Sequence, residues 1–323
     1  MTPSPTLQAL LEQGAGFDAE YGTGLSDHRP MALVALERLG AGADRLQAFA
    51  RQYEQAKGLR PTRAAAGWPS GEAWAGRLGD RAAWPLYRDL FRQWLMHEGV
   101  AEVLEQVLPA LMPGCAAAAF HGPIRLAYGL QAGHAGEVAD GLAHWACFHQ
   151  PLGALRPMGD AVDPLPLLRR LRAGTSAAPL IAGRIADAAR GGAVNRVIGA
   201  LRIDAGTPER MARAAALAYA ETGNFTALHL VTATHAMRVI AAQVDADPAL
   251  PAWRWFWQAW AHGVVAARLA RKPAVPLLEW EQILPRAIAS DDEHVVKLVD
   301  SAREEERVYG GDDWRRAASR AVA

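Results

Sequence analysis

Histidines near predicted helix starts are the side chains of this chain best suited to hold a metal ion. Imidazole nitrogen binds iron, zinc, copper and nickel, and helical proteins gather such ligands by pointing them inward from several helices. Each histidine taken singly is more often a packed or solvated residue, and the spacing is not that of a closed structural zinc site. Together the histidines predict a metal centre built from residues far apart in the chain. Four of the ten are the candidates: His28, His121, His229 and His294.

Two of these histidines precede a proline in the same way. His121 lies two residues before Pro123, and His28 lies two residues before Pro30. Proline suits the first turn of a helix because its missing N–H would be unpaired there. The positive end of the helix dipole disfavours imidazolium, so we expect neutral imidazoles, the form that binds metal.

The remaining candidates are judged by their spacing on a helix. His229 and His235 are six residues apart, about 240° around a helix, so they do not face one ion together. His294 and Lys297 are three residues apart and share a face. Lys297 is one of only three lysines among 34 basic residues. The ordinary alternative for this pair is a solvated helix start with a surface lysine.

The segments that must position these residues have helical periodicity. We find no alternating strand pattern and predict an all-α protein. Proline and glycine interrupt the pattern at Gln150–Pro164, which we expect to be a surface connection within a single domain spanning residues 1–323. Thr207 and the Ser290–Glu293 stretch are expected to cap helices. The predicted helices include Thr6–Gln13, Ser26–Gly40, Leu46–Lys57, Arg81–Glu98, Val100–Met112, Leu165–Arg172, Ala178–Arg190, Val194–Ile203 and Thr207–Thr222.

Composition excludes several classes of partner. The 323 residues are 51% hydrophobic with a formal net charge of zero, so neither nucleic acid nor an anionic membrane is expected as a partner. Cys115 and Cys147 give no disulfide framework, which favours a reducing cytoplasm. The first residues lack the pattern of a signal peptide, and no run has the length of a membrane span.

Three tryptophans recur at helical spacing: Trp253, Trp257 and Trp260. They suit packing in the core or at an interface, or the wall of a site for a flat aromatic substrate.

Four stretches resemble the questin oxidase-like family, and its bacterial members in particular. The similarity spans roughly residues 17 to 308, and the stretches occur in the family's order: SDHRPMALVALERLGA, FHGPIRLAYGLQAGHAGEVADGLAHWA, TGNFTALHLVTATHA and DDEHVVKLV. Fungal members open the rings of hydroxyanthraquinones. The resemblance implies a non-haem iron oxygenase that uses O₂, with NADPH as a candidate reductant. It also implies iron held by histidines and by a lysine that can be carboxylated.

The family's metal-binding positions carry over to five residues: His28, His121, His229, His294 and Lys297. Asp27 stands where the family usually has asparagine, and Arg125 replaces the second histidine of its His-Pro-Leu-Ile-His pattern. We expect Arg125, His134 or His235 to act in catalysis by orienting ligands or an ionised phenol.

The favoured hypothesis is thus a cytoplasmic, all-helical oxygenase that uses Fe²⁺ to oxidise a polycyclic phenol or quinone, with homo-oligomerisation as a further expectation. Two alternatives stay open from the residues alone. One is a helical metal-dependent hydrolase, in which the same ion activates water. The other is an alanine-rich binding or scaffold protein whose histidines are structural.

Overall fold

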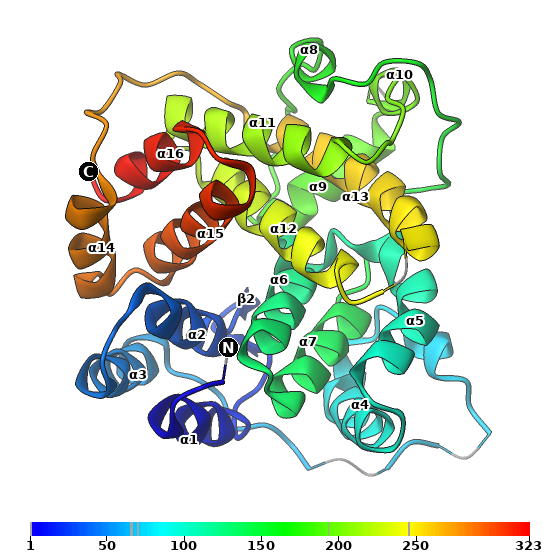
Figure 1. Ribbon diagram of the computed structural model, residues 1–323. Coiled ribbons are helices and arrows are strands. Elements are labelled where there is room, and N and C mark those ends of the chain that lie inside the picture. Colours follow the sequence, from blue (N-terminus) through cyan, green and yellow to red (C-terminus); the bar gives the residue numbers. More distant parts are fainter. Residues whose placement is uncertain (1, 65–66, 70, 193, 245) are drawn as a thin grey trace.

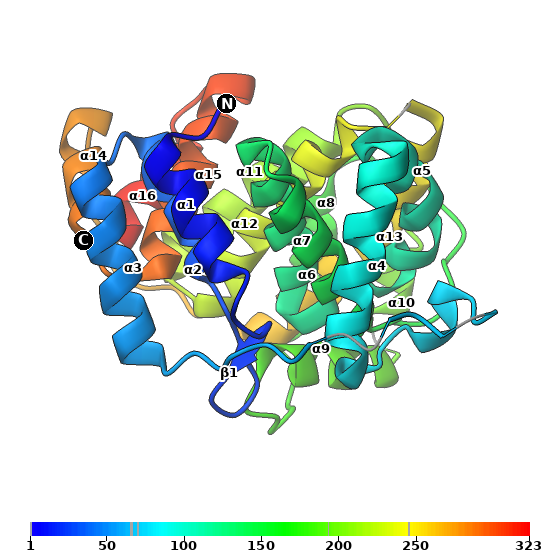
Figure 2. The ribbon, with the colours of Figure 1, turned by 90° about the horizontal axis from the view of Figure 1, so that it is seen from below.

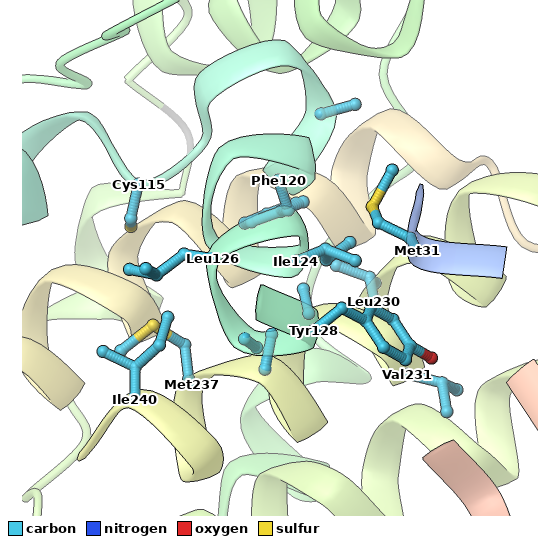
Figure 3. Close-up of a cluster of buried hydrophobic side chains, with 14 of the residues drawn as sticks. Met31, Cys115, Phe120, Ile124, Leu126, Tyr128, Leu230, Val231, Met237 and Ile240 are labelled. Carbon is cyan, nitrogen blue, oxygen red and sulfur yellow. The ribbon is translucent and has the colours of Figure 1, made fainter. Parts of the chain in front are cut away.

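Helix α6 (Ala117–Ala132) runs through the middle of the molecule (Figure 1). Its sequence is apolar almost throughout, so nearly all of its side chains are buried and it packs against neighbours on several sides. Figure 3 shows Phe120, Ile124 and Tyr128 of this helix beside Met31 and Leu230, which come from two other helices. The hydrophobic core is therefore centred on the stretch that contains His121.

The computed structural model describes residues 2–64, 67–69, 71–192, 194–244 and 246–323. Its first half contains α1 (Pro5–Gly14), α2 (Arg29–Leu39), α3 (Ala43–Lys57), α4 (Trp84–Glu98), α5 (Val100–Leu111), α6 and α7 (Ala135–Cys147). The second half contains α8 (Pro164–Leu168), α9 (Ile181–Arg190), α10 (Asn195–Ile198), α11 (Thr207–Thr222), α12 (Phe225–Ala241), α13 (Ala246–Ala267), α14 (Trp280–Ala289), α15 (Glu293–Tyr309) and α16 (Asp313–Ala321). The prediction of an all-α fold is confirmed.

Four helices form a closed ring around the centre of the molecule. Helix α2 packs on α6, α6 on α12, α12 on α15, and α15 returns to α2. In Figure 2, α1 and α3 flank this group on one side, and α4 and α5 lie on the other. The ring brings residues from both ends of the chain together, although more than two hundred residues separate α2 from α15.

Some local predictions were wrong. The segment before α2 contains a short antiparallel pair, β1 (Glu20–Tyr21) with β2 (Leu25–Ser26), in which Glu20 pairs with Ser26. Strands of two residues are too short to show an alternating pattern. Two predicted caps were also misplaced: Gly206, not Thr207, caps α11, and Asp292, not Ser290, caps α15. Helices α8 and α10 are shorter than predicted, because glycines and prolines interrupt this part of the chain.

The connection between α7 and α8 follows the prediction in its local structure. Residues 149–163 contain no helix and are mostly exposed, and Ala161 hydrogen-bonds to the backbone of Ala200 and Arg202.

The three regularly spaced tryptophans of α13 are buried in the core, as the packing interpretation expected: Trp253, Trp257 and Trp260. Among the described residues, no helix is both long and apolar enough to cross a membrane.

Candidate metal centre

His28 is held at the start of α2 by its own backbone. It is the capping residue of the helix, and its N–H donates a hydrogen bond to the Tyr53 hydroxyl at 2.9 Å. The neighbouring Asp27 carboxylate accepts from the backbone N–H of Arg29 at 2.9 Å. Only 5% of His28 is exposed. The imidazole is thus directed into the protein from a fixed backbone position.

An unusual left-handed turn positions His121. Ala118, Ala119 and Phe120 have φ angles of 46°, 61° and 70°, which cost about 1–2 kcal/mol per residue for side chains other than glycine. The right-handed part of α6 begins after this turn, so Pro123 lies in its first turn, as predicted. The His121 Nδ1 atom is hydrogen-bonded to the Ala118 carbonyl oxygen. Because a carbonyl only accepts, Nδ1 carries the proton, and the buried Nε2 is left without a hydrogen-bond partner.

His229 is presented in the same tautomer from α12. Asn224 caps this helix by accepting hydrogen bonds from the N–H groups of Thr226 and Ala227. One turn further on, His229 Nδ1 donates to the carbonyl oxygen of Phe225 at 2.8 Å. The lone pair of Nε2 is therefore available to a ligand or a metal.

His294 and Glu293 open α15. Asp292 caps the helix, and its Oδ1 atom lies 3.1 Å from His294 Nδ1. This hydrogen bond, as the largest contribution, lowers the pKa of Asp292 to about 2. Glu293 is 4% exposed, which is unusual for a carboxylate at a helix start.

The four imidazoles contact one another in the order of their helices, and we call them the histidine cluster. The ring centroids of His28 and His121 are 4.5 Å apart, and those of His121 and His229 are 5.0 Å apart. The centroids of His229 and His294 are 5.6 Å apart, and those of His294 and His28 are 4.6 Å apart. The four histidines among the five predicted metal ligands are thus brought together, one from each helix of the central ring.

Glu293 forms a group with His28 and His294 that could bind a metal ion, and sequence reasoning missed it. Ligand atoms of His28, Glu293 and His294 all lie within 4.8 Å of one another. Glu293 Oε1 also accepts a hydrogen bond from Lys57 Nζ at 2.9 Å. The sequence signal was its position next to His294, in a stretch predicted only to cap the helix.

Lys297 faces the histidine cluster from the next turn of α15. Its Nζ atom lies 3.3 Å from His28 Nδ1, and the residue is 1% exposed. Burial lowers the pKa of Lys297 to about 8. The ordinary alternative of a solvated surface lysine is therefore wrong, and more of the amine is neutral at a given pH than for a solvated lysine.

Burial also keeps the imidazoles neutral. It lowers the pKa of His229 to about 3 and lowers the pKa values of His28 and His121 well below the usual range. The pKa of His294 is lowered for the same reason. His28 caps α2 and the other three lie in the first two turns of their helices, near the positive end of the helix dipole, which opposes protonation. Four convergent helix starts create a positive potential that anionic ligands would offset.

The donor set fits a first-row transition metal. Neutral imidazole nitrogens together with a carboxylate oxygen are ligands for iron, zinc, copper and nickel. The Nε2 atom of His121 is buried and unpaired in the protein, a costly arrangement that a metal ion would relieve.

The three residues predicted to act in catalysis have partners outside the histidine cluster. Arg125 pairs with the carboxylates of Glu137 and Asp140 at 3.0 and 3.2 Å. His134 caps α7 by accepting a hydrogen bond from the backbone of Glu137. His235 lies on the far side of α12 from His229, and its partners are Glu305 and Gln131, at 2.6 and 2.9 Å. Their catalytic roles stay a prediction, and each side chain has a structural task in this fold.

Phe225 lies where the cluster approaches the surface. Its ring centroid is 4.8 Å from that of His229 and 4.7 Å from that of His294. The residue is nevertheless 52% exposed, an uncommon degree for a large aromatic side chain. The contacts of this exposed ring with two imidazoles place that side of the cluster next to the protein surface.

The fold and the site thus define a helical protein with a buried, histidine-rich candidate metal centre. The profile of the questin oxidase-like family matches residues 25–302, and the chain belongs to this family. Family membership implies an oxidoreductase. A search among curated proteins finds no match.

Proposed function

We propose that this protein is a non-haem iron oxygenase that oxidises a polycyclic phenol or quinone of the hydroxyanthraquinone type. The observation that carries the proposal is the closed contact of four neutral imidazoles beside the buried carboxylate of Glu293. Membership of an oxidative family supports the reaction class. O₂ and a small aromatic substrate are the proposed partners, and NADPH is the proposed reductant.

The histidine cluster would hold the ion, with Glu293 and Lys297 supplying negative charge. A bound ferrous ion supplies the one-electron chemistry through which ground-state O₂ reacts with organic molecules. Lysine contributes as a carbamate: the neutral Nζ attacks CO₂, a nitrogen–carbon bond forms, and the displaced proton leaves to solvent. The lowered pKa of Lys297 supports this step because only the neutral amine reacts.

Residues at the mouth of the centre would orient the substrate. The exposed ring of Phe225 offers a flat apolar surface on which an aromatic ring system stacks. The four helix starts favour an anion beside the cluster, so an ionised phenol is preferred over a neutral one. Both features select a flat, acidic aromatic molecule.

Metal analysis with a matched pair of variants tests the proposal. Protein purified without chelator should contain about one iron per chain and consume O₂ when a hydroxyanthraquinone and NADPH are added. His229→Ala should lose the metal and the O₂ consumption while keeping its helical circular dichroism. His262→Ala is the control, because His262 Nδ1 makes the same kind of contact to a carbonyl one turn back and His262 is not part of the histidine cluster.

Two results would contradict the proposal. If His229→Ala retained its metal as fully as His262→Ala, the cluster would not be the metal centre. If metal-free protein oxidised the substrate at the wild-type rate, the ion would have no part in the reaction. Cytoplasmic location and self-association stay predictions, which cell fractionation and sedimentation would test.

A further inference from the structure

A cavity of about 750 Å³ lies beside α9 and the last turn of α13. Residues 170–176 form its other wall. Apolar side chains, among them Leu171, Val194 and Val265, line part of it, and arginines line the rest. A cavity of this size accommodates a small organic molecule.

The charge around this cavity is strongly unbalanced. Its lining contains five arginines and a single acidic residue, Asp187, although the whole chain has a net charge of zero. Asp187 is already engaged by Arg190 and by the Ser176 hydroxyl. Within the described part of the chain, the other lining arginines form no ion pair: Arg170, Arg172, Arg184 and Arg268. Guanidinium groups concentrated in this way attract an anion.

Two of these arginines have energetically unfavourable features. The Nε atom of Arg184 is buried and has no hydrogen-bond partner, and the contacts of its terminal nitrogens are long, at 3.4 and 3.5 Å. Arg268 has a φ angle of 51°, a left-handed conformation that is strained for an arginine, and its guanidinium donates to the Ser176 carbonyl. The unpaired Nε atom and the long contacts of Arg184 leave its guanidinium able to bind a ligand at the cavity.

We infer that this cavity binds a small organic molecule through a phosphate group. Guanidinium pairs with phosphate oxygens through two parallel hydrogen bonds, and a phosphate carries enough charge to engage several arginines at once. The apolar part of the lining would contact the organic portion. The inference does not depend on the oxidation reaction or on a bound metal.

The cavity is structurally connected to the candidate metal centre. Arg184 reaches the Thr226 hydroxyl at 3.5 Å, and Thr226 follows Phe225 in the first turn of α12. The same turn carries the carbonyl that fixes His229. A phosphate that drew Arg184 into the cavity would therefore act on the helix start that positions the cluster.

Isothermal titration of the full-length protein with ADP, at low and moderate salt, tests this inference. ADP should bind, and added salt should weaken binding because the contacts are ionic. Adenosine, which lacks the phosphates, should not bind measurably. Arg172→Ala should weaken ADP binding by about tenfold, since one charge-assisted hydrogen-bonding partner is lost. Arg172 is exposed, so the variant should unfold at the wild-type temperature.

Arg316→Ala is the matched control, because Arg316 is also exposed and lines a smaller basic pocket of about 410 Å³. The control should bind ADP like the wild type. The inference is overturned if ADP does not bind at millimolar concentration, or if adenosine binds equally well. It is also overturned if Arg316→Ala weakens ADP binding as much as Arg172→Ala does.

Discussion

The Nζ atom of Lys297 lies 3.3 Å from Nδ1 of His28, a contact between residues separated by 269 positions in the chain. Both side chains are almost fully buried, and the pKa of each is shifted toward the neutral form, chiefly by burial. A protonated lysine at this position can donate a hydrogen bond but cannot serve as a metal ligand. A neutral amine that becomes a carbamate would add an anionic ligand beside four helix starts.

Replacing Lys297 by arginine should therefore be as damaging as replacing it by alanine. A guanidinium keeps its proton and cannot react with CO₂, so both Lys297→Arg and Lys297→Ala should lose most of their bound metal. Added bicarbonate should raise the metal content of the wild type alone. Lys272→Arg, at an exposed lysine, is the control. If Lys297→Arg kept its full metal content, Lys297 would not be a ligand, and the histidines and Glu293 alone would bind the metal.

Phe225 should limit access to the candidate metal centre. Phe225→Ala removes an exposed ring that contacts two imidazoles, so a chelator should extract the metal faster than from the wild type. The KM for an aromatic substrate should rise by up to about tenfold, which corresponds to the binding free energy of one lost aromatic contact. Phe225→Tyr should restore both properties. Identical extraction rates in the alanine variant and the wild type would exclude this role.

Acid should destabilise the protein partly through His144. Burial lowers the pKa of His144 in the folded protein to about 3, while the unfolded chain titrates near 6.5. Between these values the unfolded state binds a proton that the folded state does not, so the free energy of unfolding falls as pH falls. His144→Gln should make the slope shallower by about 1.4 kcal/mol per pH unit in this range. Urea unfolding of the metal-free protein from pH 7 to pH 4 measures it, and an unchanged slope would refute the assignment.

Arg125 should prove to be a structural residue. It is 2% exposed and pairs with the buried carboxylates of Glu137 and Asp140. Arg125→Ala would leave Glu137 as an uncompensated buried charge and lower the free energy of unfolding by about 3–5 kcal/mol. Metal content of the folded fraction should be unchanged, and Arg125→Met combined with Glu137→Leu should recover much of the stability. Loss of substrate oxidation at unchanged stability would instead support the catalytic role expected from the sequence.

The sequence by itself determined the fold class and most of the ligand candidates. The periodicity of apolar residues and the positions of prolines identify the helices that carry the histidines. These signals are readable from the sequence because helix starts depend on local backbone chemistry. His28 and His121 both lie two residues ahead of a proline, but His28 caps α2 whereas His121 follows a left-handed turn. Their rings are stacked in the structure, 4.5 Å apart.

Only the tertiary structure decided which groups meet. Burial of Glu293 follows from the packing of α15 against α2 and α12, which no local pattern reveals. The ion pair of Arg125 with Glu137 and the hydrogen bond of His235 with Glu305 likewise depend on tertiary packing, which the sequence pattern does not reveal. The left-handed turn before His121 contains no glycine to signal it. Burial and charge at this centre are set by long-range packing, so the electrostatics of the site could not be predicted from the sequence alone.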